Sequence, residues 1–313
     1  MVSADVSTLA PAERSISTLT LNNSILDRTR EPKVFIALTA QEIGGRGLVK
    51  AILEHPRVVP CAIYAPGRAV SQLVIVGKNV PGVLAKIAAR IAENGINILS
   101  GLVTAEPGED TGMLTLFLDF TNATCGPEEL AEELRAMDVV LEAGVVARRF
   151  GDIAIDGTTH TTMFLGERVV MLSVDDLGAM FDWLDRNLQT GGHVLLFEMG
   201  KAASRADVRE LREAYGLEGR DLVEAFLALR IAAGWFSYEV VEYDEEAMRF
   251  VVRLYGSFEC AFFAGRGRSM GHLVRGILAG AFGEVYGREF RVREVKCVAK
   301  GDECCEFVVE LAK

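Results

Sequence analysis

The most regular pattern of apolar and polar positions lies between Ser71 and Phe150. Apolar residues recur at helical spacing from Val83 to Asn94, Gly95 is placed to end that helix, and Pro127 opens a second helix. The strands predicted by apolar runs or alternation are Leu73–Val76, Ile96–Val103, Met113–Phe120 and Val139–Arg148. The predicted order is βαββαβ, a ferredoxin-like unit.

Beyond Gly166 the pattern predicts a second α+β domain, because no repeated βαβα run suggests a doubly wound sheet. The predicted strands are Val169–Ser173, His193–Met199, Trp235–Tyr243, Arg249–Tyr255, Glu289–Cys297 and Cys305–Leu311. The predicted helices are Asp175–Leu188, Arg205–Tyr215, Asp221–Ala233 and Leu273–Tyr286. Gly191-Gly192 is expected to end the first of these helices.

The first 70 residues give no fold. Short candidate elements are Ser15–Leu21, Lys33–Leu38 and Gly47–Leu53, and prolines interrupt the remainder of the stretch. We therefore expect three parts: residues 1–70 of uncertain fold, a small domain at residues 71–150, and a second domain at residues 166–313.

The charge and composition disfavour some classes of function. The chain has 313 residues with a net charge of −11, which disfavours nucleic-acid binding. No apolar run approaches the ~20 residues of a membrane span, and the N-terminus lacks the features of a secretory signal. We expect a cytoplasmic protein, whose six cysteines form no disulfide framework.

The loop Lys78-Asn79-Val80-Pro81-Gly82 and the turn at Gly95-Ile96-Asn97-Ile98 give the first family resemblance. With the βαββαβ order, they resemble an ACT domain, although ACT domains commonly carry Asp where this chain has Asn79. The resemblance implies a homodimer of domains side by side with an amino acid bound between them. Its candidate ligand-binding residues are Lys78, Asn79, Val80, Pro81, Gly82 and Asn97. Backbone N–H groups after the loop would suit a carboxylate, since they begin a helix.

Cysteines near the C-terminus suggest a metal site. Cys297 and Cys305 flank a turn at Lys300-Gly301-Asp302 that can bring them together, and Glu294 is an acceptable third ligand for zinc. Glu294 and Cys297 share a face only if their strand bulges or turns. Packing of reduced thiols as small apolar side chains explains the same residues equally well.

The segment from Glu294 to Phe307, together with Val194–Gly200 and the glycine-rich helix at Gly271–Gly287, resembles the 4-vinyl reductase-like domain of aromatic-responsive sensors. The resemblance spans residues 166–313. It implies zinc bound by Glu, Cys and Cys, which favours Cys305 over Cys304, plus a further Cys at the start of the preceding helix. Here that stretch reads Ser269-Met270-Gly271-His272, so His272 is the substitute candidate.

The predicted function is a non-catalytic, ligand-sensing regulatory protein that binds an amino acid and an apolar or aromatic molecule. Its output requires an unidentified partner protein. Two alternatives stay open. One is an enzyme that reduces a vinyl group of a tetrapyrrole, although no nicotinamide or flavin motif is visible. The other is an assembly module that holds an acyl chain. The molecule that co-purifies with the protein would separate them.

Overall fold

The computed structural model of the protein describes residues 57–312 apart from residues 147, 159 and 160. The described chain forms two compact units, one ending at Met171 and the other beginning at Leu172. The elements expected at Ser15–Leu21, Lys33–Leu38 and Gly47–Leu53 lie outside the described residues.

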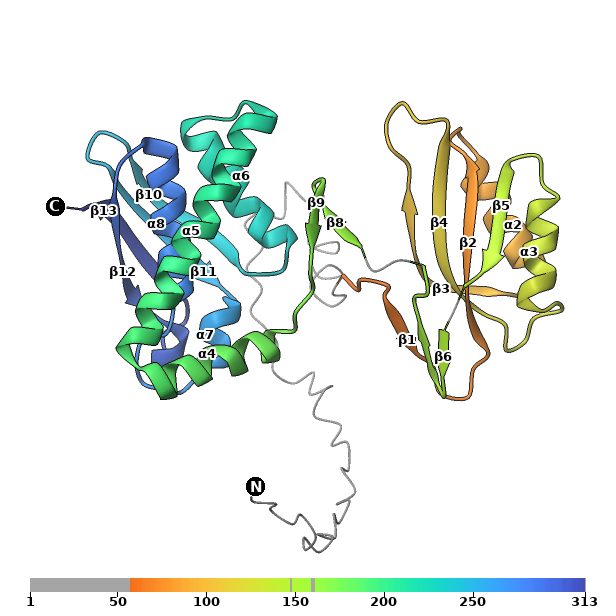
Figure 1. Ribbon diagram of the computed structural model, residues 1–313, viewed down its shortest axis with the longest axis horizontal. Helices are drawn as coiled ribbons and strands as arrows, with labels where there is room; N and C mark the ends of the chain where they lie inside the picture. The colour runs from red at the N-terminus through yellow and green to blue at the C-terminus, as the bar shows by residue number, and fades with distance from the viewer. Residues whose placement is uncertain (1–56, 147, 159–160, 313) are drawn as a thin grey trace, which may run out of the picture. The chain divides into compact units, whose positions relative to one another are not determined.

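The first unit contains the βαββαβ unit predicted from the sequence (Figure 1). Its strands are β2 (Val70–Lys78), β3 (Asn97–Thr104), β4 (Thr111–Asp119) and β5 (Val140–Val145), and its helices are α2 (Val83–Glu93) and α3 (Pro127–Arg135). The sheet is antiparallel in the order β3-β4-β2-β5. Pro127 is the first residue of α3, as expected, because its missing N–H has no partner at that position.

The two helices cover one face of this sheet. Val83, Ile87 and Ile91 form the buried stripe of α2, and α3 buries Leu130 and Leu134. These side chains pack on the sheet residues Leu73, Ile75, Leu114, Leu116, Leu118 and Ala143. Apolar spacing that matches the 3.6-residue helical period therefore fixes the fold of this layer.

A small sheet lies on the opposite face, in the order β1-β7-β6. Its strands are β1 (Ala62–Tyr64), β6 (Arg148–Phe150) and β7 (Ile153–Ile155). Phe117 of the main sheet is fully buried in a cluster with Ala65, Val70 and Ala154. The end of the segment whose fold the sequence left open is thus part of this unit.

A polar contact fastens the chain after β7 to the same face. The buried Gln72 side chain donates to Asp156 Oδ1 at 2.7 Å and accepts from the Gly157 backbone N–H at 3.0 Å. Both polar ends of the amide are satisfied, so its burial carries no desolvation penalty from an unpaired group. The unit ends in a separate hairpin of β8 (Thr162–Phe164) and β9 (Glu167–Val169).

The second unit is a four-stranded antiparallel sheet, in the order β10-β11-β13-β12, with helices (Figure 1). Its strands are β10 (Ser237–Asp244), β11 (Arg249–Tyr255), β12 (Phe290–Lys296) and β13 (Cys305–Leu311). Its helices are α4 (Val174–Leu188), α5 (Thr190–Tyr215), α6 (Gly219–Ala232), α7 (Phe258–Phe262), α8 (His272–Tyr286) and the 3-10 turn η2 (Val298–Lys300). The predicted α+β class is confirmed for both units.

Three sequence predictions for the chain beyond Gly166 are wrong in whole or in part. His193–Met199 is part of the long helix α5, not a strand, and Gly191-Gly192 begins this helix instead of ending the previous one. The chain turns at Gln189, whose φ is 47°. The strand expected at Val169–Ser173 overlaps β9 only at Val169, and residues 170–173 form no strand. A short apolar run has no period of its own, and here helix packing decided its conformation.

Helices α5 and α8 pack with little space between their backbones. A Cβ on Gly276 would lie 1.9 Å from the Phe197 carbonyl oxygen, and one on Gly280 would lie 2.3 Å from the Lys201 carbonyl oxygen. Gly276 and Gly280 therefore allow the close packing of α8 on α5, which offsets their helix-propensity cost of about 1 kcal/mol each.

Within the described residues, no helix combines the length and the apolar character needed to cross a bilayer.

Candidate metal centre and ACT loop

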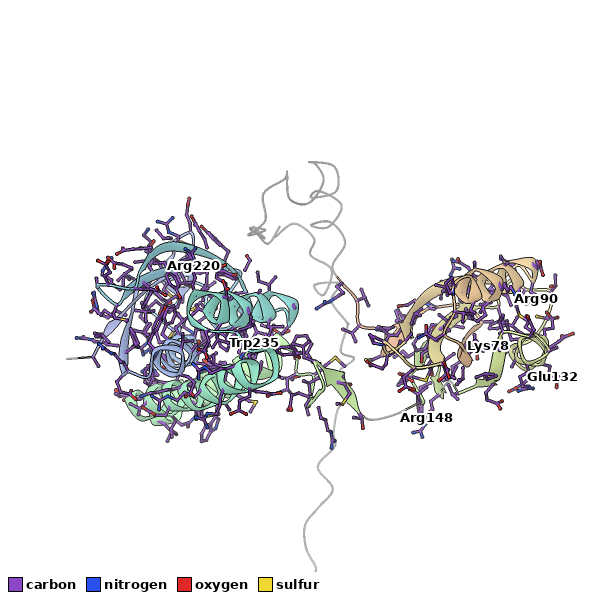
Figure 2. All side chains as sticks on the ribbon, turned by 90° about the horizontal axis from the view of Figure 1, so that it is seen from above. Lys78, Arg90, Glu132, Arg148, Arg220 and Trp235 are labelled. Atoms are coloured by element: carbon purple, nitrogen blue, oxygen red, sulfur yellow. The ribbon has the colours of Figure 1, made fainter. Side chains whose placement is uncertain are left out.

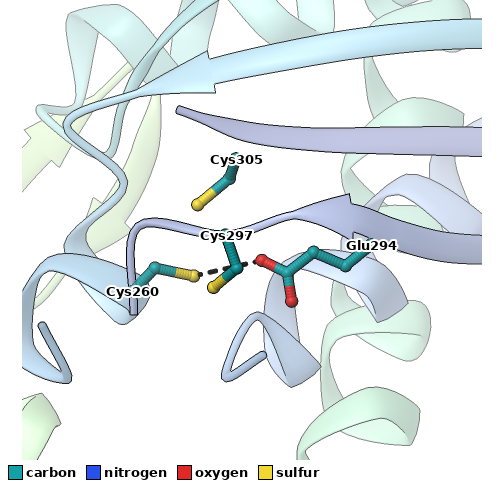
Figure 3. Close-up of side chains that lie close together, drawn as sticks. All are labelled: Cys260, Glu294, Cys297 and Cys305. Carbon is teal, nitrogen blue, oxygen red and sulfur yellow. Dashed lines mark hydrogen bonds between the residues drawn. The ribbon is translucent and has the colours of Figure 1, made fainter. Parts of the chain in front are cut away.

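Four side chains of the second unit meet at one point: Cys260, Glu294, Cys297 and Cys305 (Figure 3). One ligand atom from each lies within 4.8 Å of all the others. The three cysteines are buried and Glu294 is half-buried. Figure 3 shows the three sulfur atoms and the carboxyl group converging from separate segments. Three of these residues were predicted from the sequence, and Cys260 was not.

A bulge and a tight turn place the three predicted residues. The pairing of β12 with β13 shifts register between Glu294 and Lys296, which meets the condition for Glu294 and Cys297 to share a side. After β12 the chain turns through η2, and the Cys297 backbone N–H donates to Asp302 Oδ2 at 2.7 Å. The Val298 N–H points at Cys305 Sγ, 3.5 Å away.

Cys260 arrives on the short helix α7, which is held by the residue before it. Glu259 is 1% exposed and accepts hydrogen bonds from the backbone N–H groups of Leu273 and Val274, at 2.9 and 3.0 Å. These groups begin α8, whose N-terminus attracts carboxylates. The neighbouring Gly271 N–H donates to Glu294 at 3.1 Å. The start of α8 therefore positions both Cys260 and Glu294.

The four side chains perturb one another strongly. Hydrogen bonds from the neighbouring thiols of Cys260 and Cys305 lower the pKa of Cys297 far below its usual range. The pKa of Cys260 rises, chiefly because its thiol proton bonds to Cys297. Burial, with the charge of Cys297 beside it, raises the pKa of Glu294 to about 8. Without a cation, such a buried group of acids cannot all ionise.

The donor set fits a divalent metal with soft ligands. Three thiolates and one carboxylate oxygen make up the coordination number of a structural zinc site, and tetrahedral zinc–sulfur bonds of about 2.3 Å place neighbouring sulfurs about 3.7 Å apart. The span of 4.8 Å is close to that requirement. These residues could hold a metal, and a metal would supply the positive charge that lets all four ionise.

Two neighbouring candidates lie outside the cluster. Cys304 is buried but is not among the four residues. His272, the predicted substitute ligand, is not among them either. Its ring stacks on His193 with centroids 3.9 Å apart, and its Nδ1 lies 2.8 Å from the Arg275 guanidinium. Cys260, on α7, is the fourth residue of the cluster. The family resemblance had implied a fourth ligand at the start of α8.

The sequence could have indicated Cys260 only through the number of ligands that a zinc site needs. A structural zinc site needs four protein ligands, and the spacing supplied three. Cys61 and Cys125 belong to the first unit, and Cys304 lies just before β13 and is not one of the four clustered residues. The remaining cysteine, Cys260, lies in an apolar stretch at no family spacing, so only elimination could have selected it.

The candidate ligand residues of the first unit lie in two places. Lys78 is the exposed last residue of β2 and is labelled in Figure 2. The exposed loop that follows, before α2, contains Asn79, Val80, Pro81 and Gly82. Asn97 is exposed at the start of β3. In the sheet, Lys78 pairs with Thr111 and Asn97 with Asp119, at opposite ends of β4. At 3.4 Å per residue, roughly 27 Å of β4 separates them, so one small ligand cannot contact both in one chain.

The loop has features suited to an anion. Gly82 adopts a left-handed conformation with φ of 89°, and α2 begins with no side-chain cap and no acidic residue in its first turn. Nearby, a hollow of about 250 Å³ opens on the sheet face away from the helices. It is lined by Val76, Thr104, Glu106, Glu109, Thr111, Gly112 and Met113. Asn79 closes this end by donating to the Glu109 carbonyl oxygen at 2.9 Å.

Solved structures are similar to parts of this chain. The phenol-responsive sensory domain of the transcription activator PoxR, with phenol, is 18% identical, with 53% of this chain and 85% of that chain covered and a TM-score of 0.43. A vinyl-4-reductase family protein of Methanocaldococcus jannaschii is 17% identical, with 46% and 85% covered and a TM-score of 0.34. The ACT domain of the Chlorobium tepidum GTP pyrophosphokinase is 19% identical, with 25% and 97% covered and a TM-score of 0.22.

Sequence comparison gives a relative and two family matches. An uncharacterized protein of Methanocaldococcus jannaschii is 26% identical over 121 residues, which are 39% of this chain and 66% of that protein. The chain therefore spans just under two thirds of that relative. The family model of the ACT domain matches residues 71–138, and that of the 4-vinyl reductase domain matches residues 250–311, which include all four residues of the cluster. The chain thus joins an ACT domain to a 4-vinyl reductase domain.

Proposed function

We propose that this protein is a ligand-sensing regulatory protein with two ligand-binding domains and a structural zinc site. In this proposal the ACT domain binds an amino acid or a similar small carboxylate, and the C-terminal domain binds an apolar or aromatic molecule. The output requires a partner protein. The presence of both domain types on one chain carries the proposal.

The proposed amino-acid site is the loop Lys78–Gly82. The N-terminus of α2, which has no side-chain cap, and the left-handed Gly82 support it, because helix N–H groups are donors for a carboxylate. Lys78, exposed at the end of β2, adds a positive charge to the same loop. The carboxylates of Glu106 and Glu109 at the adjacent hollow favour the ammonium group of an amino acid over a simple dicarboxylate. Asn97 is excluded from this site within one chain by its position at the other end of the sheet.

The ACT domain is also proposed to form a homodimer through residues 71–150. Strand β3 is an edge of its sheet and presents unpaired backbone groups that a second copy would satisfy. Light scattering should give a dimer mass at micromolar concentration, with and without amino acids. A monomer mass under both conditions contradicts this part of the proposal.

Zinc is proposed to be structural, because three thiolates and a carboxylate leave no open position for a substrate or water. Its removal should change the stability of the C-terminal domain and leave the ACT domain folded. That division follows because all four residues lie in the second unit.

Calorimetry of the full chain against a panel of amino acids tests the sensing proposal. We expect heat from at least one amino acid, reduced at least tenfold in affinity by Pro81→Ala with Gly82→Val, which places a branched side chain in the left-handed region. Gly151→Val is the matched control, since Gly151 also has positive φ and open space around it but lies in a distant turn. No heat from any amino acid, with the protein folded, overturns the amino-acid part.

A further inference from the structure

Helix α5 presents an apolar seam to solvent. Its inner face, including Gly200, packs against α8, and Figure 1 shows α5 in front of that helix. The opposite face carries four exposed residues, Leu195, Met199, Ala202 and Ala206, with Leu195 49% and Met199 58% exposed. The spacing of these residues, alternately four and three apart, is the a/d spacing of a coiled coil.

The side chains of the seam are large at its N-terminal end and small at its C-terminal end. Leu195 and Met199 occupy its N-terminal half, and Ala202 and Ala206 its C-terminal half. If a second α5 lies antiparallel about a two-fold axis, Leu195 meets the second copy's Ala206 and Met199 meets its Ala202. Large side chains then face small ones in every layer, which allows the helices to approach closely. A parallel pair would stack alanine on alanine and leave gaps.

The charges beside the seam fit the same arrangement. Glu198 and Arg205 flank the seam on one side, a heptad apart, so an antiparallel pair brings each Glu198 beside the other copy's Arg205. Among the described residues Glu198 forms no ion pair with another side chain. Arg205 bonds to Glu289 and keeps 34% of its side chain exposed, so it has donors left for a second carboxylate.

We propose that two copies of this protein associate through antiparallel α5 helices, with Leu195 and Met199 of each copy packed on Ala206 and Ala202 of the other. This contact is separate from the expected ACT pairing and does not depend on any ligand. A seam of two heptads is smaller than the ~800 Å² per partner of a standard interface, so the association is concentration-dependent.

Mixed cysteine variants of the full chain test the geometry. In the antiparallel pair, residue 195 is level with residue 206 of the second copy, whereas the two residues 195 lie roughly 16 Å apart along the helices. A disulfide needs Cα atoms within about 7 Å. A mixture of Leu195→Cys and Ala206→Cys chains should therefore cross-link under mild oxidation, and each variant alone should not.

Two outcomes overturn the proposal. The first is no cross-link in the mixture at hundreds of micromolar. The second is cross-linking of the Leu195→Cys variant with itself, which indicates a parallel pair. The parent chain, oxidised in parallel, is the control for its native cysteines, and only cross-links absent from it are counted.

Paired charge substitutions give a second measurement. Leu195→Glu places a carboxylate in the seam and should weaken self-association at least tenfold by sedimentation. Val194→Glu is the control, because Val194 is 54% exposed on the same helix but lies to the side of the seam. Association through the ACT domains is common to both variants. Equal self-association of the two variants, each shown to be folded by tryptophan fluorescence, also overturns the proposal.

Discussion

The two domains build their candidate sites in different ways. The ACT loop is a continuous stretch, Lys78–Gly82, and the neighbouring strand and helix present it to solvent. The metal cluster draws its four residues from a short helix, a strand bulge, a turn and the start of another strand. The first kind of site can be altered without unfolding its domain. The second kind holds segments of the fold together, so its loss should be structural.

The two tryptophans make this difference measurable. Trp183 and Trp235 both lie in the second unit, so tryptophan fluorescence reports the unfolding of that unit alone. Far-UV circular dichroism reports both units. The difference between the two signals separates the stabilities of domains that need not unfold together.

The largest expected effect comes from the metal cluster. Cys297→Ser should lower the unfolding free energy of the second unit by several kcal/mol, on the order of 3–5, because metal binding is coupled to folding. Elemental analysis of the parent, purified without an affinity tag, should find about one zinc per chain. Tryptophan fluorescence in urea measures the stability change.

Cys304→Ser is the control for this prediction. Cys304 is buried beside Cys305 but lies outside the cluster, so its replacement should cost no more than about 1 kcal/mol. If the parent contains no metal and Cys297→Ser unfolds with it, the thiols serve only as packing groups and the structural contrast between the two sites disappears.

Close helix packing gives the next effect. Gly276→Ala should destabilise the second unit by about 2–3 kcal/mol, since the new Cβ would lie 1.9 Å from the Phe197 carbonyl oxygen. Gly283→Ala on the same helix meets its nearest backbone atom at 3.1 Å, and its better helix propensity offsets that contact. Similar urea midpoints for both variants would mean that α5 and α8 can separate at little cost.

The stacked histidines predict a pH effect. Burial, followed by the charges of His193 and Arg275, lowers the pKa of His272 to about 3; Asp185 and Arg268 also face it, and only Asp185 opposes the shift. The unfolded His272 binds a proton below about pH 6.5 and the folded one does not until about pH 3, so stability falls as the pH drops through this window. At pH 5 the cost is about 2 kcal/mol.

His272→Gln removes this contribution, so the variant should lose less stability than the parent between pH 7.5 and pH 5. Urea unfolding followed by tryptophan fluorescence at the two pH values gives the comparison. An identical loss in both proteins would show that His272 is protonated in the folded state at pH 5.

The smallest effect belongs to the ACT domain. Asn79 donates its side-chain N–H to the carbonyl oxygens of Glu109 and, at 3.4 Å, Glu106. Asn79→Asp loses the donor and should destabilise this unit by about 1 kcal/mol, seen by circular dichroism without a change in tryptophan signal. Asn122→Asp, at another exposed position, is the control. A destabilisation as large as that of Cys297→Ser would show that this loop, too, holds its fold together.

The sequence predicted the ACT fold almost completely, because each of its helices and strands carries its own period and its own terminating residue. Residues such as Ile87, Gly95 and Pro127 act locally. In the second unit the sequence found β12, β13 and α8 but assigned His193–Met199 to a strand. That apolar run becomes helical because it packs on the glycines of α8, a partner about 80 residues further along the chain.

In the metal cluster, too, residues close in sequence could be predicted and those placed by distant contacts could not. Glu294, Cys297 and Cys305 are close in sequence, so spacing and a turn were enough to select them. Cys260 depends on the contact between Glu259 and the start of α8, which no spacing encodes. His272 was chosen for its position at that helix start, where its backbone neighbours bind carboxylates but its ring turns to His193.

The small sheet over the ACT domain decides where this protein can be cut. A fragment limited to residues 71–150 would lose β1 and β7 and leave the Phe117 side chain facing water. It would also strip Gln72 of both its partners. Such a fragment should aggregate or misreport ligand binding for reasons unrelated to the native protein. An expression fragment that begins at residue 57 and continues through Thr158 keeps Phe117 covered by the small sheet. It also keeps both hydrogen-bond partners of the Gln72 side chain.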